Sequence, residues 1–295
     1  MKPKLPNLAR FPALIRLVAF LLVLALLWLP IAAPIALWVA DANAVTIATM
    51  TLLFVEFLVL VQYWGRWVHG ETRIFQTYGL VRSARIGREL LIGLALGLGC
   101  LGLVFGVQES WAWIAWQPIS FPLLLKVMLE GLLTGLGTGF AEELVFRGWI
   151  LDELERDYSA RTALWVSSLI FAVLHFIKPI SEIIHTFSQF PGLLLLGLSL
   201  VWAKRSTRDL DTPYGCLGLP IGLHAGLVWG YYIIQVGGLV TYSPNIPEWL
   251  TGINKNPLAG AVGLVFLTVL AGLMQWRSKL NHRMGKPKIH RVNKL

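Results

Sequence analysis

The chain carries little charge for its length. Only 14% of its 295 residues are Asp, Glu, Lys or Arg, whereas 56% are hydrophobic and 13 are tryptophan. A soluble domain carries about 25% charged residues. The composition therefore excludes an ordinary soluble domain. It favours a polytopic membrane protein, in which successive apolar runs of about 20 residues each cross the hydrocarbon core.

Cysteine is scarce as well, and the common zinc-protease motif is missing. The two cysteines, Cys100 and Cys216, provide neither a disulfide framework nor a metal-ligand spacing, and we expect both to be inert. The sequence contains no His-Glu-x-x-His. It also shows no internal repeat, which argues against a transporter built from inverted halves.

Eight apolar segments have the length of membrane-spanning helices. They are placed at residues 17–40, 44–65, 89–108, 119–155, 161–177, 188–203, 217–235 and 258–276. The predicted fold class is all-α, a polytopic membrane protein with about eight transmembrane helices. We expect a single integral membrane domain over residues 1–295.

The basic residues give this arrangement a direction. With both termini in the cytoplasm, 22 of the 25 lysines and arginines fall in cytoplasmic segments, as the positive-inside rule requires. We therefore expect a protein of the plasma (inner) membrane or another energy-transducing membrane, with both termini cytoplasmic. Its basic balance favours contact with anionic lipid of the bilayer over binding of nucleic acid. Residues 277–295 are predicted to form a basic cytoplasmic tail with little order.

One segment places charge where a membrane tolerates almost none. It reads Ala141-Glu142-Glu143-Leu144-Val145-Phe146-Arg147-Gly148. An ionisable residue inside a bilayer costs about 3 kcal/mol on insertion scales, so such residues mark a functional site by default. On a helix Glu143 and Arg147 share a face, while Glu142 points about 100° away. Arg147 can thus hold one carboxylate in place while the other stays unpaired and acts as a base.

Two histidines are expected at the depth of these carboxylates. The fourth and fifth spans form an antiparallel hairpin, in which Glu142 and His175 each lie about 20 Å from the polar turn. His224 lies about 10 Å inside the start of the seventh span. Imidazole titrates near neutral pH, so His175 can share a proton transfer or hold a water. The fourth, fifth and seventh spans are therefore predicted to surround one cavity, open toward the cytoplasm, suited to hydrolysis.

These residues resemble the CPBP (CAAX protease and bacteriocin-processing, Abi-type) membrane proteins, which include the type II CAAX prenyl endopeptidases. The Glu-Glu-x-x-x-Arg motif of the family corresponds to Glu142, Glu143 and Arg147. Its Phe-x-x-x-His corresponds to Phe171 and His175, and its later histidine to His224. The resemblance covers a catalytic core at about residues 119–235.

The resemblance implies a glutamate-dependent intramembrane protease without a metal or other cofactor. Glu142 and His175 would activate water, and His224 would help to stabilise the oxyanion. Glu143, Arg147 and Phe171 would support them. The substrate would be a peptide or protein in or at the membrane: a prenylated C-terminus, a leader peptide and a membrane-protein segment all suit such a cavity.

The last motif departs from the family pattern. The family usually has His-x-x-x-Asn or Asp, whereas this chain reads His224-Ala225-Gly226-Leu227-Val228. An apolar residue thus stands where an amide would donate to the oxyanion. Loss of one such donor commonly costs about 10² to 10³ in rate. The neighbouring Trp229 points about 100° away on the helix and is not expected to replace it.

Several alternatives stay open. The two glutamates and Arg147 could be a structural ion pair that locks a helix bundle. Glu142, His175 and His224 could hold zinc, since two histidines and a carboxylate are a common zinc set. The whole protein could be a non-catalytic membrane scaffold or chaperone that keeps the fold and has lost part of the site. A transporter that uses the buried charges as an ion relay is a further, weaker alternative.

Three further features have mainly structural interpretations. Gly131, Gly135 and Gly139 form a ridge on the helix of the glutamates, and Gly93 and Gly97 do so on the third span, which predicts close helix packing. The loop 66–88 is expected to lie along the membrane surface or to be solvated. His69, in this loop, is expected to be solvated.

Overall fold

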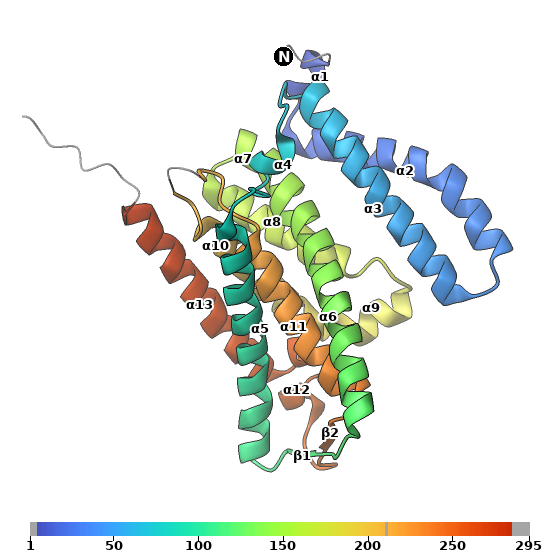
Figure 1. Ribbon diagram of the computed structural model, residues 1–295, viewed down its shortest axis with the longest axis vertical. Coiled ribbons are helices and arrows are strands. Elements are labelled where there is room, and N and C mark those ends of the chain that lie inside the picture. Colours follow the sequence, from blue (N-terminus) through green and yellow to red (C-terminus); the bar gives the residue numbers. More distant parts are fainter. Residues whose placement is uncertain (1–4, 210–211, 285–295) are drawn as a thin grey trace, which may run out of the picture.

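The computed structural model describes residues 5–209 and 212–284, and it is almost wholly helical (Figure 1). Within these residues, seven helical segments are long and apolar enough to cross a membrane. The chain is therefore an all-α polytopic integral membrane protein, as predicted. The seven segments are α2 (Ala13–Trp38), α3 (Ala42–Trp67), α5 (Ala84–Ser110), the run Phe121–Asp157, the run Ile180–Arg205, α11 (Gly218–Val236) and α13 (Ala261–Met284).

Each predicted span corresponds to a helix, and the fifth is shorter than expected. The helix α8 (Ala160–Leu174) is apolar but has 15 residues, and so is about 22 Å long. That is less than the hydrocarbon thickness of about 30 Å. The polar turn before α8 lies where it was predicted, because Ser159 caps the helix by accepting a hydrogen bond from the Thr162 N–H at 3.2 Å.

The two longer runs are each composed of several helices. Phe121–Asp157 consists of α6 (Phe121–Glu143), the π-helix η1 (Leu144–Ile150) and α7 (Leu151–Asp157). Ile180–Arg205 consists of α9 (Ile180–Thr186), the 3₁₀ turn η2 (Phe187–Gln189) and α10 (Phe190–Arg205). The short elements are α1 (Pro6–Ala9), α4 (Ile74–Thr77), α12 (Glu248–Thr251), η3 (Ile253–Lys255) and η4 (Pro257–Ala259).

A small sheet that the sequence did not predict closes one end of the bundle. Strand β1 (Ile114–Trp116) pairs antiparallel with β2 (Val240–Tyr242), with Ala115 opposite Thr241. The pairing ties the loop after α5 to the loop after α11, and both lie at the end of the molecule opposite α1 and α4 (Figure 1). This end is called the sheet end below.

Helix α11 is packed between α5 and α6, and glycines allow the contact. A Cβ atom on Gly139 would lie 2.9 Å from the Ile221 carbonyl oxygen, and one on Gly135 would lie 2.7 Å from that of Ala225. A Cβ atom on Gly97 would approach the backbone of α11 from the α5 side at a similar distance, 2.5 Å from the Leu223 oxygen. Real Cβ atoms do not come this close to a carbonyl oxygen. The predicted close packing is confirmed, and it fixes the glutamate helix against the helix of His224.

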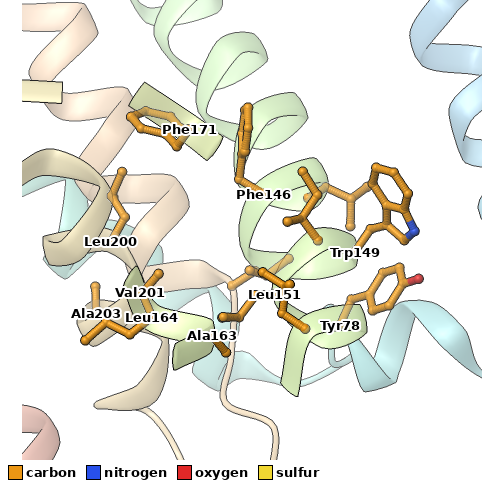
Figure 2. Packing of buried hydrophobic residues seen from close by; sticks show 14 of the residues in the cluster. Tyr78, Phe146, Trp149, Leu151, Ala163, Leu164, Phe171, Leu200, Val201 and Ala203 are labelled. Carbon is orange, nitrogen blue, oxygen red and sulfur yellow. The ribbon is translucent and has the colours of Figure 1, made fainter. Parts of the chain in front are cut away.

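The main core lies around the π-helix and α7 (Figure 2). Side chains from these segments meet α8, α10 and the end of α4 there. The buried residues that Figure 2 labels are Tyr78, Phe146, Trp149, Leu151, Ala163, Leu164, Phe171, Leu200, Val201 and Ala203. This packing fills the bundle between the glutamates and the end that carries α1 and α4.

The N-terminal hairpin of α2 and α3 leans away from the other helices, and a buried polar cluster attaches it to α7 (Figure 1). Arg16 Nε donates to Glu153 Oε2 at 2.7 Å, and Trp64 Nε1 and His69 Nε2 donate to Glu153 Oε1 at 2.8 and 2.6 Å. Asp157 accepts from Arg16 Nη1 at 3.0 Å. These five residues are called the N-terminal cluster.

The expectation that His69 is solvated is wrong. Its side chain is 6% exposed, because it is the partner of a carboxylate that is itself buried. The loop 66–88 is partly buried as well, although Arg73, Gln76, Arg82 and Arg88 are exposed. Ile74 and Tyr78 are fully buried, since Gly65 and Gly148 leave space for them. The charged residues next to these positions in the sequence suggested an exposed loop.

The end of the chain differs in part from the prediction. Helix α13 continues through Met284, and Arg277 Nη2 donates to Glu89 Oε2 at 2.8 Å, so the first residues of the predicted tail are ordered. Residues 285–295 of that tail lie outside the described residues. Both cysteines are free, as expected, and burial raises the pKa of the Cys216 thiol.

Candidate active site

The chain changes its helical winding directly after the two glutamates. Helix α6 ends at Glu143, and the next seven residues form the π-helix η1. Such wide turns are frequent at functional sites. One carbonyl of this segment is held by another helix, because Lys204 Nζ on α10 donates to the Arg147 oxygen at 2.7 Å. Lys204 is buried, whereas the predicted sixth span ends at residue 203, so the sequence did not indicate this contact.

Glu143 is fully buried, and it makes its hydrogen bonds through Oε1, whereas its Oε2 has no partner among the described residues. Its Oε1 accepts from Arg147 Nη1 at 2.9 Å and from His224 Nδ1 at 2.9 Å. Arg147 also donates to the Gly197 oxygen at 3.2 Å, and its guanidinium lies 4.2 Å from the centre of the Phe171 ring. The structural ion pair considered above therefore exists, and it involves Glu143.

Glu142 has a different environment. Its Oε2 atom is buried and has no hydrogen-bond partner among the described residues. The nearest ionisable atoms are His175 Nε2 at 3.8 Å and His224 Nε2 at 3.9 Å. These separations are too long for direct hydrogen bonds and suit a water molecule between the groups. The Glu142 side chain is 31% exposed, toward a cavity.

Both imidazole rings are oriented by their Nδ1 atoms. His175 follows the last residue of α8, and its Nδ1 lies 2.7 Å from the Phe171 oxygen. A carbonyl oxygen only accepts, so His175 carries a proton on Nδ1. His224 Nδ1 donates to Glu143 in the same way. The Nε2 atoms of both rings therefore face Glu142, and the fully buried Phe171 packs against both rings.

A cavity of about 310 Å³ begins at these three side chains. Its wall is mostly apolar and comes from α5, α6, α10, α11 and α13, with Val228 among the lining residues. The polar side chains in the wall, apart from Glu142 and the two histidines, are Thr138, Gln189, Tyr231 and Asn256. The cavity can hold an extended apolar group beside the carboxylate.

The lining residues of the cavity lie mainly on the side of Glu142 toward the sheet end. It is lined by Leu101 and Val104 in the second half of α5 and by Gly263 and Phe266 in the first two turns of α13. Both segments belong to the sheet end (Figure 1). The packed core of Figure 2 lies toward α1 and α4 instead. The opening toward the cytoplasm stays a prediction.

The residues singled out in the sequence thus meet in one place. Glu142, Glu143, Arg147, His175 and His224 form one group, here called the site cluster, with Phe171 beside it. Among the described residues, no three His, Cys, Asp or Glu side chains are arranged to hold a metal ion. Thr138 was not predicted, although its spacing of one helical turn before Glu142 is a signal that the sequence contains.

Residues 124–230 match the model of the Rce1-like family, described as type II CAAX prenyl endopeptidase Rce1-like. The match includes the whole site cluster and confirms the resemblance to type II CAAX prenyl endopeptidases over this segment. Helices α2, α3, α5 and α13 lie outside it. No curated protein and no solved structure matches the chain.

Proposed function

Because residues 124–230 carry the Rce1-like pattern, we propose that this integral membrane protein is an endopeptidase that hydrolyses a peptide bond with a water activated by Glu142. One observation carries the proposal. Glu142 Oε2 is buried, has no hydrogen-bond partner in the described part of the chain, and faces the Nε2 atoms of His175 and His224 at 3.8 and 3.9 Å. An unpaired carboxylate oxygen is costly unless a ligand or a water uses it.

We give the two glutamates separate roles in this reaction. Glu142 takes a proton from water as the water oxygen attacks the carbonyl carbon of the substrate. The carbonyl electron pair moves to the oxygen, and the C–N bond then breaks as Glu142 returns the proton to the leaving nitrogen. Glu143 is engaged with Arg147 and His224, and it orients the imidazole of His224.

The two histidines differ in what anchors them. His175 is held by a neutral carbonyl, so its Nε2 lone pair can accept from the attacking water. His224 is held by the Glu143 carboxylate through Nδ1, and its Nε2 faces Glu142 at the cavity. We give His224 the role of donor from Nε2–H to the negative charge that develops on the carbonyl oxygen.

The cavity supports a substrate that brings apolar groups to the site. A prenylated C-terminus, a leader peptide and a membrane-protein segment each present such groups next to a peptide bond. We place the protein in the plasma (inner) or another energy-transducing membrane with both termini cytoplasmic, as the distribution of basic residues favours.

Purified protein in detergent or lipid discs tests the activity against fluorogenic peptides with and without a prenyl group. We expect cleavage by the wild type, no cleavage by Glu142→Gln and His175→Ala, and no loss of activity with a chelator. Cleavage by folded Glu142→Gln at the wild-type rate would contradict the mechanism, and loss of activity in chelator would favour a zinc site.

The second candidate function is a scaffold, which Val228 favours because it is an apolar residue in the cavity wall. Complementation of a deletion strain separates the two. A scaffold keeps its cellular function when Glu142 is replaced by Gln at equal membrane abundance, whereas a protease does not.

A further inference from the structure

Thr138 lies on the face of α6 that carries Glu142, one helical turn nearer the sheet end. Both residues line the cavity, and Cβ atoms at this spacing are about 5 to 6 Å apart. On either side of Thr138, the glycine contacts hold α6 against α11: Gly139 meets Ile221 and Ala225, and Gly135 meets Ala225 and Trp229. This register places Thr138 opposite the turn of α11 between His224 and Val228, which also line the cavity.

The Thr138 hydroxyl is not used by the protein. In the other apolar helices, Thr49 donates to the Val45 oxygen at 2.8 Å and Thr268 donates to the Leu264 oxygen at 2.7 Å. This bond to the carbonyl four residues earlier is the usual way to satisfy a threonine in a helix. Thr138 makes no hydrogen bond to any residue that the structure describes, and its hydroxyl is free to bind a ligand in the cavity.

We propose that Thr138 Oγ1–H is the second donor to the oxyanion, in place of the amide that Val228 does not supply. The inference rests on the proposed hydrolysis. When the water held by Glu142 attacks, the charge moves to the carbonyl oxygen, which lies within a few ångströms of the carboxylate. His224 Nε2–H donates from α11 and Thr138 donates from α6. Two donors from opposite helices then hold the oxygen, and the apolar Val228 is tolerated.

The other polar groups of the cavity wall are less suited to this role. Asn256 lies in the loop before α13, and its Oδ1 accepts from the Leu258 N–H at 3.0 Å. Gln189 belongs to the turn η2 before α10. Neither shares a helix with Glu142, His175 or His224. Tyr231 does share α11 with His224, but it lies seven residues, or about 10 Å, farther along the helix toward the sheet end. Thr138 has a rigid position relative to the base, which an oxyanion donor requires.

The test compares substitutions on the full-length protein with the fluorogenic peptide that the wild type cleaves fastest. Thr138→Val keeps the shape and removes the hydroxyl, and Thr138→Ser keeps the hydroxyl. Thr134→Val is the matched control, because Thr134 is on the same helix, is exposed and does not line the cavity. Melting temperature in detergent shows that each variant folds.

We expect Thr138→Val to lower kcat about 10- to 100-fold with little change in KM, because only the transition state uses the bond. Thr138→Ser and Thr134→Val should stay near the wild type, and Val228→Asn added to Thr138→Val should restore part of the rate. Wild-type kcat in Thr138→Val, or equal losses in the Val and Ser variants, would overturn the inference. Equal rates for the wild type and Glu142→Gln would instead overturn the proposed function.

Discussion

The site cluster and the N-terminal cluster contain the same kinds of buried residues, Glu, His and Arg, and both use the run from Phe121 to Asp157. They differ in whether the carboxylate oxygens have hydrogen-bond partners. In the N-terminal cluster, both Glu153 oxygens accept hydrogen bonds, from Arg16, Trp64 and His69. In the site cluster, the Oε2 atoms of Glu142 and Glu143 both have no partner among the described residues, and Glu142 lines a cavity. The proposed function therefore rests on an unpaired carboxylate beside a cavity rather than on buried charge alone.

The same substitution at the two clusters should have opposite consequences, and the larger effect is expected at the site. Glu142→Gln should lower kcat about 10³-fold, within the range for loss of a general base. Its melting temperature should equal or exceed that of the wild type, because the change removes an unsatisfied carboxylate. Peptide cleavage and thermal unfolding in detergent measure the two effects. A folded variant with wild-type kcat would remove the distinction between the clusters.

Glu153→Gln should instead reduce stability and leave the chemistry intact. It leaves the fully buried Arg16 with Asp157 as its charged partner, and breaking a buried ion pair of this kind costs about 3 kcal/mol. The melting temperature should fall, while kcat per folded molecule should not change. Arg16→Met is a second variant with the same expectation. A loss of kcat without a loss of stability would show that the N-terminal cluster also serves catalysis.

Lys204 contacts the backbone of a site-cluster residue, Arg147, and should give an intermediate effect. Lys204→Met removes the donor to the Arg147 oxygen and leaves a buried carbonyl unsatisfied in the π-helix. We expect a stability loss of about 1 to 2 kcal/mol and a several-fold lower kcat, because Arg147 orients Glu143. Thermal unfolding and cleavage are again the measurements, with Lys279→Met on α13 as a control for loss of one positive charge. An effect no larger than that of the control would show that the π-helix does not need this contact.

Much of the site was predictable because helices impose simple geometry. The four-residue spacing of Glu143 and Arg147 predicted their ion pair. The number of residues between each side chain and the turn of the hairpin predicted that Glu142 and His175 lie at the same depth. The glycine ridge gave the contact between α6 and α11. In each case, the relevant distance is fixed by a count of residues along one helix or one hairpin.

The remainder depends on contacts between segments that are far apart in the sequence. The partner of His69 lies 84 residues away, and the contact of Lys204 with Arg147 spans 57 residues. The direction of the cavity depends on α5 and α13, which pack beside α10 and α11 only in the folded bundle. The π-helix has no residue signature of its own, so a regular helix was predicted through it.

The smallest effect is expected from Val228→Asn, which makes the wall of the cavity more like the family pattern. An amide there adds a donor near the developing oxyanion, and it faces the cavity rather than a packed core, so its desolvation cost is small. We expect kcat to stay equal or to rise a few-fold, with Val228→Leu as the size control. A folded Val228→Asn variant without activity would contradict this expectation. Activity that appears only in Val228→Asn would show that the native chain is a scaffold whose site lacks one donor. The site cluster and the N-terminal cluster would then both have structural roles in the native protein.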